Sequence, residues 1–231
     1  MQKESVEAGI KLGSGILRGC LGLSDERLGV PLYNRRNQLR RNDLNLPESR
    51  CNLLLHSAVH FGKYIFLCHN TAAIDEAALL LQRANAVYCL GQGGSMVLAN
   101  DIWVRFATIS NKFRNCGDSH TQLIAASLMG PGNVILFVSY SGSTHDMMDT
   151  LTIAKNSGAK IILITHYADA PGTSLADVVL LCGALETPLD GGSIPVKVGE
   201  LFVAESLIMR YLLDNKELAT IARDKTSTAI W

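Results

Sequence analysis

Short apolar runs alternate with amphipathic segments over most of the chain after residue 85. Four runs have the length and composition of buried strands, and a fifth segment fits a short strand: residues 86–90, 134–138, 160–165 and 178–182, with 112–116 as the short one. Several intervening segments instead repeat apolar residues at helical spacing, as Met147, Leu151 and Ala154 do. This alternation predicts a mainly parallel sheet with helices on both faces.

Three more helices are predicted outside this alternating region. One begins at Glu48, one at the capping pair Asn70-Thr71, and a long one runs from about Pro195 to Leu213. The long helix is apolar nearly all round, which predicts burial in a core or an interface. Residues 1–50 contain several glycines, an arginine cluster and weak periodicity. We therefore divide the chain into an N-terminal arm or linker, residues 1–50, and a folded domain, residues 51–231.

One turn stands out for its hydroxyl groups. Ser139, Ser141, Ser143 and Thr144 lie between the strand predicted at 134–138 and the helix that follows it. Exposed N–H groups and partial positive charge at a helix N-terminus attract anions. The hydroxyls add donors, and Gly142 lets the backbone approach a ligand without a Cβ in the way. Four hydroxyls in six positions favour a phosphate site over an ordinary Ser or Thr cap.

A second turn, residues 91–95, follows the strand predicted at 86–90 and reads Gly-Gln-Gly-Gly-Ser. Such a turn also suits a dinucleotide, but the Gly-x-Gly-x-x-Gly pattern fails because residue 96 is Met. Asp118 lies near the distance of about 20 residues expected of a ribose partner, but in a predicted loop, so NAD is a minor alternative. Two such turns at the carboxyl ends of parallel strands suit a sugar phosphate better.

Composition and charge narrow the class of protein. Of 231 residues, 48% are hydrophobic and 18% charged, which indicates a packed globular chain. The formal net charge is zero, whereas a free-standing nucleic-acid binder normally carries a basic excess. The one basic cluster, Arg35, Arg36, Arg40 and Arg41, is interpreted as a solvated helix face or linker.

Compartment and metal content follow from other features of the sequence. No apolar run is long enough to span a membrane, and the first residues lack a signal-peptide core. Six cysteines lie far apart without paired metal-ligand spacing: Cys20, Cys51, Cys68, Cys89, Cys116 and Cys182. They predict free thiols in a reducing cytoplasm. His56 and His60 are spaced i, i+4 on a predicted helix but have no evident third ligand, so we predict no metal site and no cofactor.

Seven short motifs follow one another between about residues 85 and 213. They are Gly91-x-Gly93-Gly94-Ser95, Asp118-Ser119-His120, Ser139-x-Ser141-Gly142-x-Thr144, Ala154-Lys155-x-x-Gly158-Ala159-Lys160, Ile161-x-x-Ile164-Thr165, Leu175-Ala176-Asp177 and Glu186-Thr187-Pro188-Leu189. In this order they resemble the sugar isomerase (SIS) domain, and more narrowly the effector-binding half of RpiR-type transcriptional regulators.

The resemblance implies an α/β fold, a three-layer αβα sandwich around a five-stranded, mainly parallel sheet that dimerises through helices. It also implies a phosphosugar held between the two turns. The residues expected to hold the phosphate are Ser95, Ser139, Ser141 and Thr144. His120 and Lys197 are expected to reach the ligand from nearby. We add Gly94, Gly142 and Ser143 to the predicted site, together with Glu200, which can accept from sugar hydroxyls.

RpiR-type regulators begin with a helix-turn-helix domain, and no convincing one is evident before the predicted SIS domain. We therefore expect a truncated or shortened effector domain that senses a phosphorylated sugar or amino sugar. It is expected to act as a homodimer or tetramer, with no membrane partner. DNA binding is expected only through a helix-turn-helix domain not evident in this chain.

The competing function is an aldose–ketose sugar-phosphate isomerase. Such an enzyme needs a general base near C1 and C2 of the sugar, and the candidates are Glu200, His120 and His145. Arabinose-5-phosphate isomerase relatives carry a His-Gly-Asp segment after the second strand, which is missing here. The Glu-Thr-x-Thr-Pro-like segment of hexulose-phosphate isomerase relatives is also missing. A binding module without catalytic residues is therefore favoured.

Overall fold

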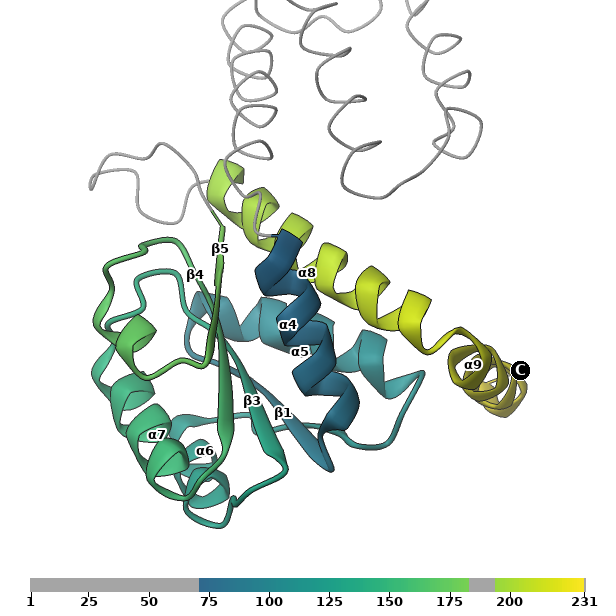
Figure 1. Cartoon of the computed structure of the whole chain (residues 1–231), viewed down its shortest axis with the longest axis horizontal. Coiled ribbons are helices and arrows are strands. Elements are labelled where there is room, and N and C mark those ends of the chain that lie inside the picture. The colour runs from purple at the N-terminus through teal and green to yellow at the C-terminus, as the bar shows by residue number, and fades with distance from the viewer. Residues whose placement is uncertain (1–70, 183–193, 231) are drawn as a thin grey trace, which may run out of the picture. The chain divides into compact units, whose positions relative to one another are not determined.

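Five parallel strands form one sheet in residues 71–182 and 194–230, the part of the chain that the computed structural model describes (Figure 1). The strands are β1 Ala86–Gly91, β2 Phe113–Asn115, β3 Asn133–Val138, β4 Lys160–Thr165 and β5 Val178–Leu181. Their order across the sheet is β2-β1-β3-β4-β5, and every neighbouring pair is parallel. The predicted five-stranded sheet is confirmed.

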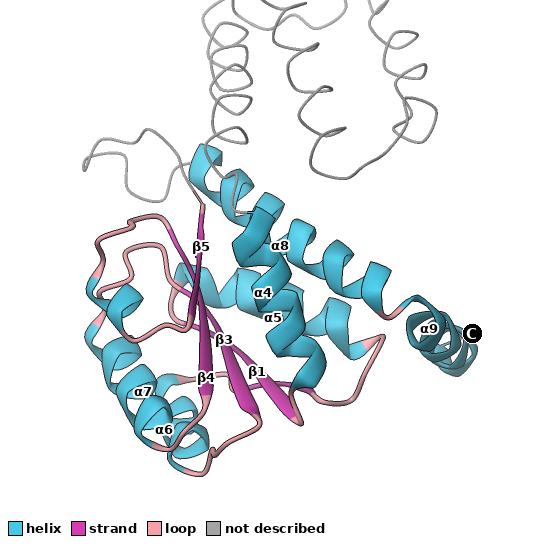
Figure 2. Ribbon diagram, in the orientation of Figure 1, coloured by secondary structure: helices cyan, strands magenta, loops and turns pink. Residues whose placement is uncertain are grey.

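Helices cover both faces of this sheet, as Figure 2 shows. They are α4 Thr71–Arg83, α5 Gly94–Ala107, α6 Ser119–Ser127, α7 His145–Asn156, the 3-10 helix η3 Pro171–Ser174, α8 Ile194–Asp214 and α9 Lys216–Ile230. Helices α6 and α7 lie together on one face, and α4, α5 and α8 lie on the other. This confirms the three-layer αβα sandwich. None of the helices in the described ranges is long and apolar enough to cross a membrane.

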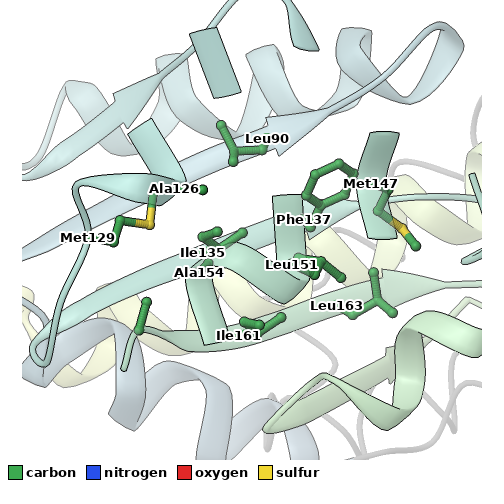
Figure 3. Close-up of a cluster of buried hydrophobic side chains, with 11 residues drawn as sticks. Leu90, Ala126, Met129, Ile135, Phe137, Met147, Leu151, Ala154, Ile161 and Leu163 are labelled. Carbon is green, nitrogen blue, oxygen red and sulfur yellow. The ribbon is translucent and has the colours of Figure 1, made fainter. Parts of the chain in front are cut away.

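The core beneath α6 and α7 combines alternate residues of the strands with the inner faces of these helices, such as Leu151 and Ala154 of α7 (Figure 3). Ile135 and Phe137 of β3 point to this face and are fully buried, as are Ile161 and Leu163 of β4. Successive side chains of a strand point to opposite faces, so the residues between them serve the other core. Because β3 and β4 are apolar on both faces, the sheet needs a helical layer on each side.

An aromatic cluster fixes the second core. Phe106 of α5 stacks on Phe113 of β2, with ring centroids 4.2 Å apart. Tyr211 of α8 packs edge-on against both rings, at 5.3 and 5.6 Å. The ion pairs Arg105–Glu205 and Arg210–Asp75 join α8 to α5 and to α4. The long helix α8 is therefore part of this core, as its sequence predicts.

The exposed residues of the C-terminal helices show where the prediction was incomplete. Leu201 is 47% exposed and Leu213 is 58% exposed, although an all-apolar helix predicts burial. Helix α9 was not predicted, because its sequence is polar and has few apolar repeats; Leu218 and Ile221 on it are exposed. The predicted helix from Glu48, the loop at 187–193 and the domain boundary at residues 50 and 51 lie outside the described residues.

The strand order places two turns next to each other. β1 and β3 are neighbours at the point where the order of the strands reverses, and Gly91 at the end of β1 pairs with Val138 at the end of β3. The helices after these strands, α5 and α7, lie on opposite faces. The carboxyl ends of strands at such a reversal are the usual ligand site of an open α/β sheet.

Candidate functional site

The turn after β1 brings the start of α5 close to the strand. A Cβ on Gly91 would lie 2.8 Å from the Ser95 carbonyl oxygen and 3.2 Å from Cβ of Ala99, so only glycine allows this close approach. Gly93 is the N-cap of α5, and no side chain caps the helix. Gly94 is exposed and Ser95 is partly buried in the first turn. At the start of α5, the Ser95 N–H donates to the Gln92 carbonyl at 3.1 Å and the Met96 N–H to the Gly93 carbonyl at 3.2 Å, and the N-cap glycine adds no side-chain acceptor.

The turn after β3 is shaped by its own hydroxyl groups. Ser139 Oγ accepts a hydrogen bond from the Gly142 N–H at 3.2 Å, and Ser141 Oγ accepts from the Ser143 N–H at 3.4 Å. Gly142 has a φ of 58° and its backbone packs tightly against Thr165 and Ala170. Thr144 is the N-cap of α7, yet its side chain makes no capping hydrogen bond. An ordinary Thr cap therefore does not explain the hydroxyl of Thr144.

That hydroxyl connects the two turns instead. Thr144 Oγ1 donates to Gln92 Oε1 at 3.3 Å, across 52 positions of sequence. The residues predicted to hold a phosphate, Ser95 on one side and Ser139 and Ser141 on the other, are thus brought to one edge of the sheet. Two helix N-termini without side-chain caps meet here, and their partial positive charges favour an anion.

A buried glutamine, Gln122 of α6, joins the turn after β2 to the end of β1. Its Nε2 donates to the Gly91 carbonyl at 2.9 Å and to the Cys116 carbonyl at 3.2 Å. The residue is fully buried, and its Oε1 has no partner among the described residues. Sequence analysis did not identify it. The only signal was a polar residue at a position of α6 that faces the sheet.

Helix α6 carries His120 to the same edge of the sheet. Asp118 is the N-cap of α6. Its carboxylate accepts hydrogen bonds from the Thr121 N–H at 2.9 Å and from the Thr121 hydroxyl at 2.8 Å. The hydrogen bond from the Thr121 N–H is the main reason that the pKa of Asp118 lies below its ordinary value. The Asp118 carboxylate is thus engaged in capping, while His120 in the first turn is exposed. Burial, aided by Asp118, raises the pKa of the nearby Cys116 thiol, which disfavours a thiolate nucleophile there.

Three rings lie beside the serine turn. Tyr140 stacks on His166 with centroids 5.2 Å apart, and Tyr167 packs edge-on against both. The Tyr140 and Tyr167 hydroxyls are 3.3 Å apart, and His166 Nδ1 lies 2.9 Å from the Cys182 carbonyl oxygen. His166 directly follows β4 in the sequence. The structure places it directly beside the turn, packed against Tyr140.

The charged candidates on the other helices lie in contrasting environments. Lys197 is exposed on the first turn of α8, whereas Glu200 is only 6% exposed and engaged with another residue. Lys197 therefore faces solvent at the start of α8, and Glu200 does not. His145, the candidate base on α7, is 89% exposed and lies 3.1 Å from the Asp149 carboxylate.

The described cysteines and histidines do not form a metal site. Cys89 and Cys116 are free thiols. Within residues 71–182 and 194–230, no three His, Cys, Asp or Glu side chains are grouped to hold a metal ion. His56 and His60 lie outside these ranges.

Comparison with known proteins identifies relatives of this domain. The chain is 32% identical over 161 residues to the HTH-type transcriptional regulator RpiR of Escherichia coli K12. The aligned region covers 70% of this chain and 54% of that protein. The chain thus spans about half the length of the curated relatives it matches.

Solved structures share the fold. The Vibrio vulnificus NanR protein, solved in complex with ManNAc-6P, aligns with a TM-score of 0.72 and 23% identity, over 79% of this chain and 70% of that one. The sugar isomerase domain of an RpiR transcription factor from Sphaerobacter thermophilus aligns with a TM-score of 0.68 and 18% identity, over 79% and 99%. At these identities, the likeness establishes the fold alone.

The family assignment rests on a match of sequence over more than half of the chain. The family model described as the SIS domain matches residues 80–210, which contain both turns, the whole sheet and most of α8. The order of motifs and the strand order agree with this match. The chain belongs to the SIS domain family.

Proposed function

We propose that this chain is the phosphosugar-sensing domain of an RpiR-type transcriptional regulator of sugar metabolism. The observation that carries the proposal is the meeting of two hydroxyl-bearing turns, joined by Thr144 and Gln92, at the reversal of strand order. The regulator named RpiR supports the class of protein, and the NanR complex with ManNAc-6P supports the class of ligand. DNA binding would belong to a helix-turn-helix domain of the whole protein, which we place in the cytoplasm.

In this proposal the phosphate lies between the two helix N-termini. Ser95, Ser139, Ser141 and Thr144 donate to its oxygens, with Gly94, Gly142 and Ser143 supplying the backbone around it. His120 is proposed to approach from α6. Lys197 and Glu200 are proposed to meet the sugar from α8, where the burial of Glu200 favours a polar contact over a solvated position.

A thermal-shift screen of the whole chain tests the proposal. The panel contains arabinose 5-phosphate, ribose 5-phosphate, glucosamine 6-phosphate and N-acetylmannosamine 6-phosphate, each beside its unphosphorylated sugar. A ligand that binds only the native state raises the melting temperature by mass action. We expect at least one phosphosugar to do so and its free sugar to have far less effect. No shift with any phosphosugar of a wider pentose, hexose and amino-sugar set would contradict the proposal.

Calorimetry on Ser141→Ala tests the position of the phosphate. Loss of a hydrogen bond to a charged group should weaken binding by about 1–3 kcal/mol without a change of fold. Ser227→Ala, at an exposed position of α9, is the matched control and should bind as the wild type does. Equal affinity in the wild type and Ser141→Ala would remove Ser141 from the site.

The site is proposed to bind its ligand without converting it. The structure leaves the candidate base His145 in an exposed pair with Asp149, which does not favour a role in proton abstraction. Exchange of the C2 proton of each phosphosugar in deuterated water measures this directly. We expect no turnover; a rate above about 1 per second, the low end for enzymes, would favour an isomerase.

A further inference from the structure

The amide of Gln92 uses only one of its two polar atoms in this structure. Gln92 Oε1 accepts the hydrogen bond from Thr144, while Nε2 is buried and has no hydrogen-bond partner among the described residues. Most buried polar groups of native proteins are hydrogen-bonded, and an unpartnered one calls for an explanation. Nε2 lies at the point where the turns after β1 and β3 meet, on a residue that is only partly buried as a whole.

The hydrogen bond from Thr144 also limits what the site can do. A threonine hydroxyl carries a single proton, and here it is donated to Gln92 Oε1 at 3.3 Å, a long distance for an O–H···O bond. A phosphate that accepts from Thr144 must replace Gln92 Oε1 as the acceptor of this hydrogen bond. The Gln92 amide then loses the one hydrogen-bond donor that it has among the described residues, and it can turn about its side-chain bonds.

We propose that Gln92 is itself a ligand-binding residue, whose Nε2 donates a hydrogen bond to a phosphate oxygen of the ligand. The inference rests on the proposed function and adds a residue to that site. When the ligand enters, the Thr144 hydroxyl donates its hydrogen bond to the phosphate in place of Gln92 Oε1. The Gln92 amide then rotates so that Nε2 donates to a second phosphate oxygen. The same exchange opens the link between the two turns and lets the ligand lie between them.

Gln122 holds Gln92 in place for this contact. Its two donated hydrogen bonds, to the carbonyls of Gly91 and Cys116, fix the backbone next to Gln92 and set the spacing of the turns after β1 and β2. Gln122 is a positioning residue, because it is fully buried and reaches the site only through the backbone.

Calorimetry with two probes tests the assignment on the whole chain: inorganic phosphate, and the phosphosugar that gives the largest thermal shift. Gln92→Met keeps the approximate volume and removes both polar atoms. It should weaken both probes by about tenfold or more, the loss expected for a hydrogen bond to a charged group. The melting temperature of the ligand-free variant should stay equal or rise, because an unpartnered buried donor has been removed.

A second variant tests the same contact in case Gln92→Met does not fold stably. Gln92→Glu keeps an acceptor for Thr144 but replaces the donor with an anionic oxygen, and it should abolish binding of both probes. Gln82→Glu adds the same charge at an exposed position of α4 and should leave affinity unchanged.

The outcomes separate the inference from the proposed function. Unchanged affinity for both probes in Gln92→Met or in Gln92→Glu would overturn the role of Gln92, while a wild type that binds both probes leaves the phosphosugar site standing. A loss confined to the phosphosugar would also overturn it, since the amide would then meet the sugar and not the phosphate. A wild type that binds neither probe would refute the site and the inference together.

Discussion

Some residues of this domain belong to the proposed site, whereas others stabilise the sheet. Asp177 belongs to a motif that helped to identify the family, but it lies at the start of β5, at the amino edge of the sheet and away from the two turns. Its carboxylate accepts from Lys160 Nζ at 2.8 Å and from the Ile161 N–H at 2.9 Å, with Lys155 Nζ at 3.3 Å. It therefore ties the start of β4 to β5 and to the end of α7.

The charge state of Asp177 makes this support dependent on pH. Partial burial alone would raise the pKa of Asp177, but the hydrogen bonds from Lys160, the Ile161 N–H and Lys155 outweigh it and lower that pKa. Because the native pKa is below the unfolded one, the stabilisation is present above about pH 4 and is lost as the pH falls through the native pKa.

Urea unfolding of Asp177→Asn at several pH values measures this contribution. At pH 7 the variant should lose about 1 kcal/mol of unfolding free energy, a modest value because both lysines are well exposed. The difference from the wild type should shrink below about pH 4, where the wild-type carboxylate also becomes neutral. Asp224→Asn, at an exposed position of α9, is the control and should change little at any pH. A difference that persists unchanged at pH 3 would contradict this account.

At the scale of elements, the strand–turn–helix unit from β3 to α7 depends on Gly142. Its φ of 58° lies in the left-handed region, and an added Cβ would lie 2.6 Å from Cβ of Ala170 and 2.8 Å from Oγ1 of Thr165. The Gly142 carbonyl also accepts from the Gly172 N–H at 2.9 Å, which joins the turn to η3. The conformation of the turn and its packing thus require the same residue.

Gly142→Ala should therefore destabilise the domain and weaken phosphosugar binding. Backbone strain of about 1–2 kcal/mol and overpacking of about 1–3 kcal/mol predict a total loss of about 2–5 kcal/mol. Gly117→Ala is the matched control, because its φ is not positive and an added Cβ would meet no atom within 4 Å. Thermal unfolding of both variants checks the prediction. Equal melting temperatures would show that the turn can rearrange.

The elements also show what local pattern could predict. The ends of β4 and α8 fall within a residue or two of their predicted places, because the length of an apolar run and the residues that bound it are properties of the segment itself. Helix α9 was missed because its polar sequence carries few apolar repeats. The exposure of Leu201 was also missed, since an apolar residue does not reveal which face of a helix meets the core.

At the scale of the whole molecule, exposed apolar side chains favour self-association. Leu213 of α8 is 58% exposed and Leu218 of α9 is 68% exposed, and Leu201 of α8 and Ile221 of α9 are exposed as well. Clustered apolar surface is uncommon on soluble monomers and marks contact surfaces. We therefore predict a dimer, or a tetramer built from dimers, with these helices in the interface.

Light scattering at micromolar concentration checks this prediction. A dimer should give a mass of about 50 kDa, twice the 25.0 kDa of the chain. Leu213→Lys should shift the protein toward the monomer, because it buries a charge in the predicted interface. Leu128→Lys, at the 82% exposed C-cap that follows α6, introduces the same change away from α8 and α9 and should leave the mass unchanged. A monomeric wild type would contradict the prediction.

The sequence by itself determined the strands, the two turns and most of the residues proposed for the site. Its alternation of apolar runs and amphipathic segments reports local structure, and its hydroxyl-rich turns report chemistry that a helix N-terminus can use. Only the tertiary structure decided which turns meet, how Gln122 and Gln92 connect them, and that Glu200 is buried while Lys197 is exposed. These facts depend on strand order and on contacts between residues as far as 52 positions apart, which no local period encodes.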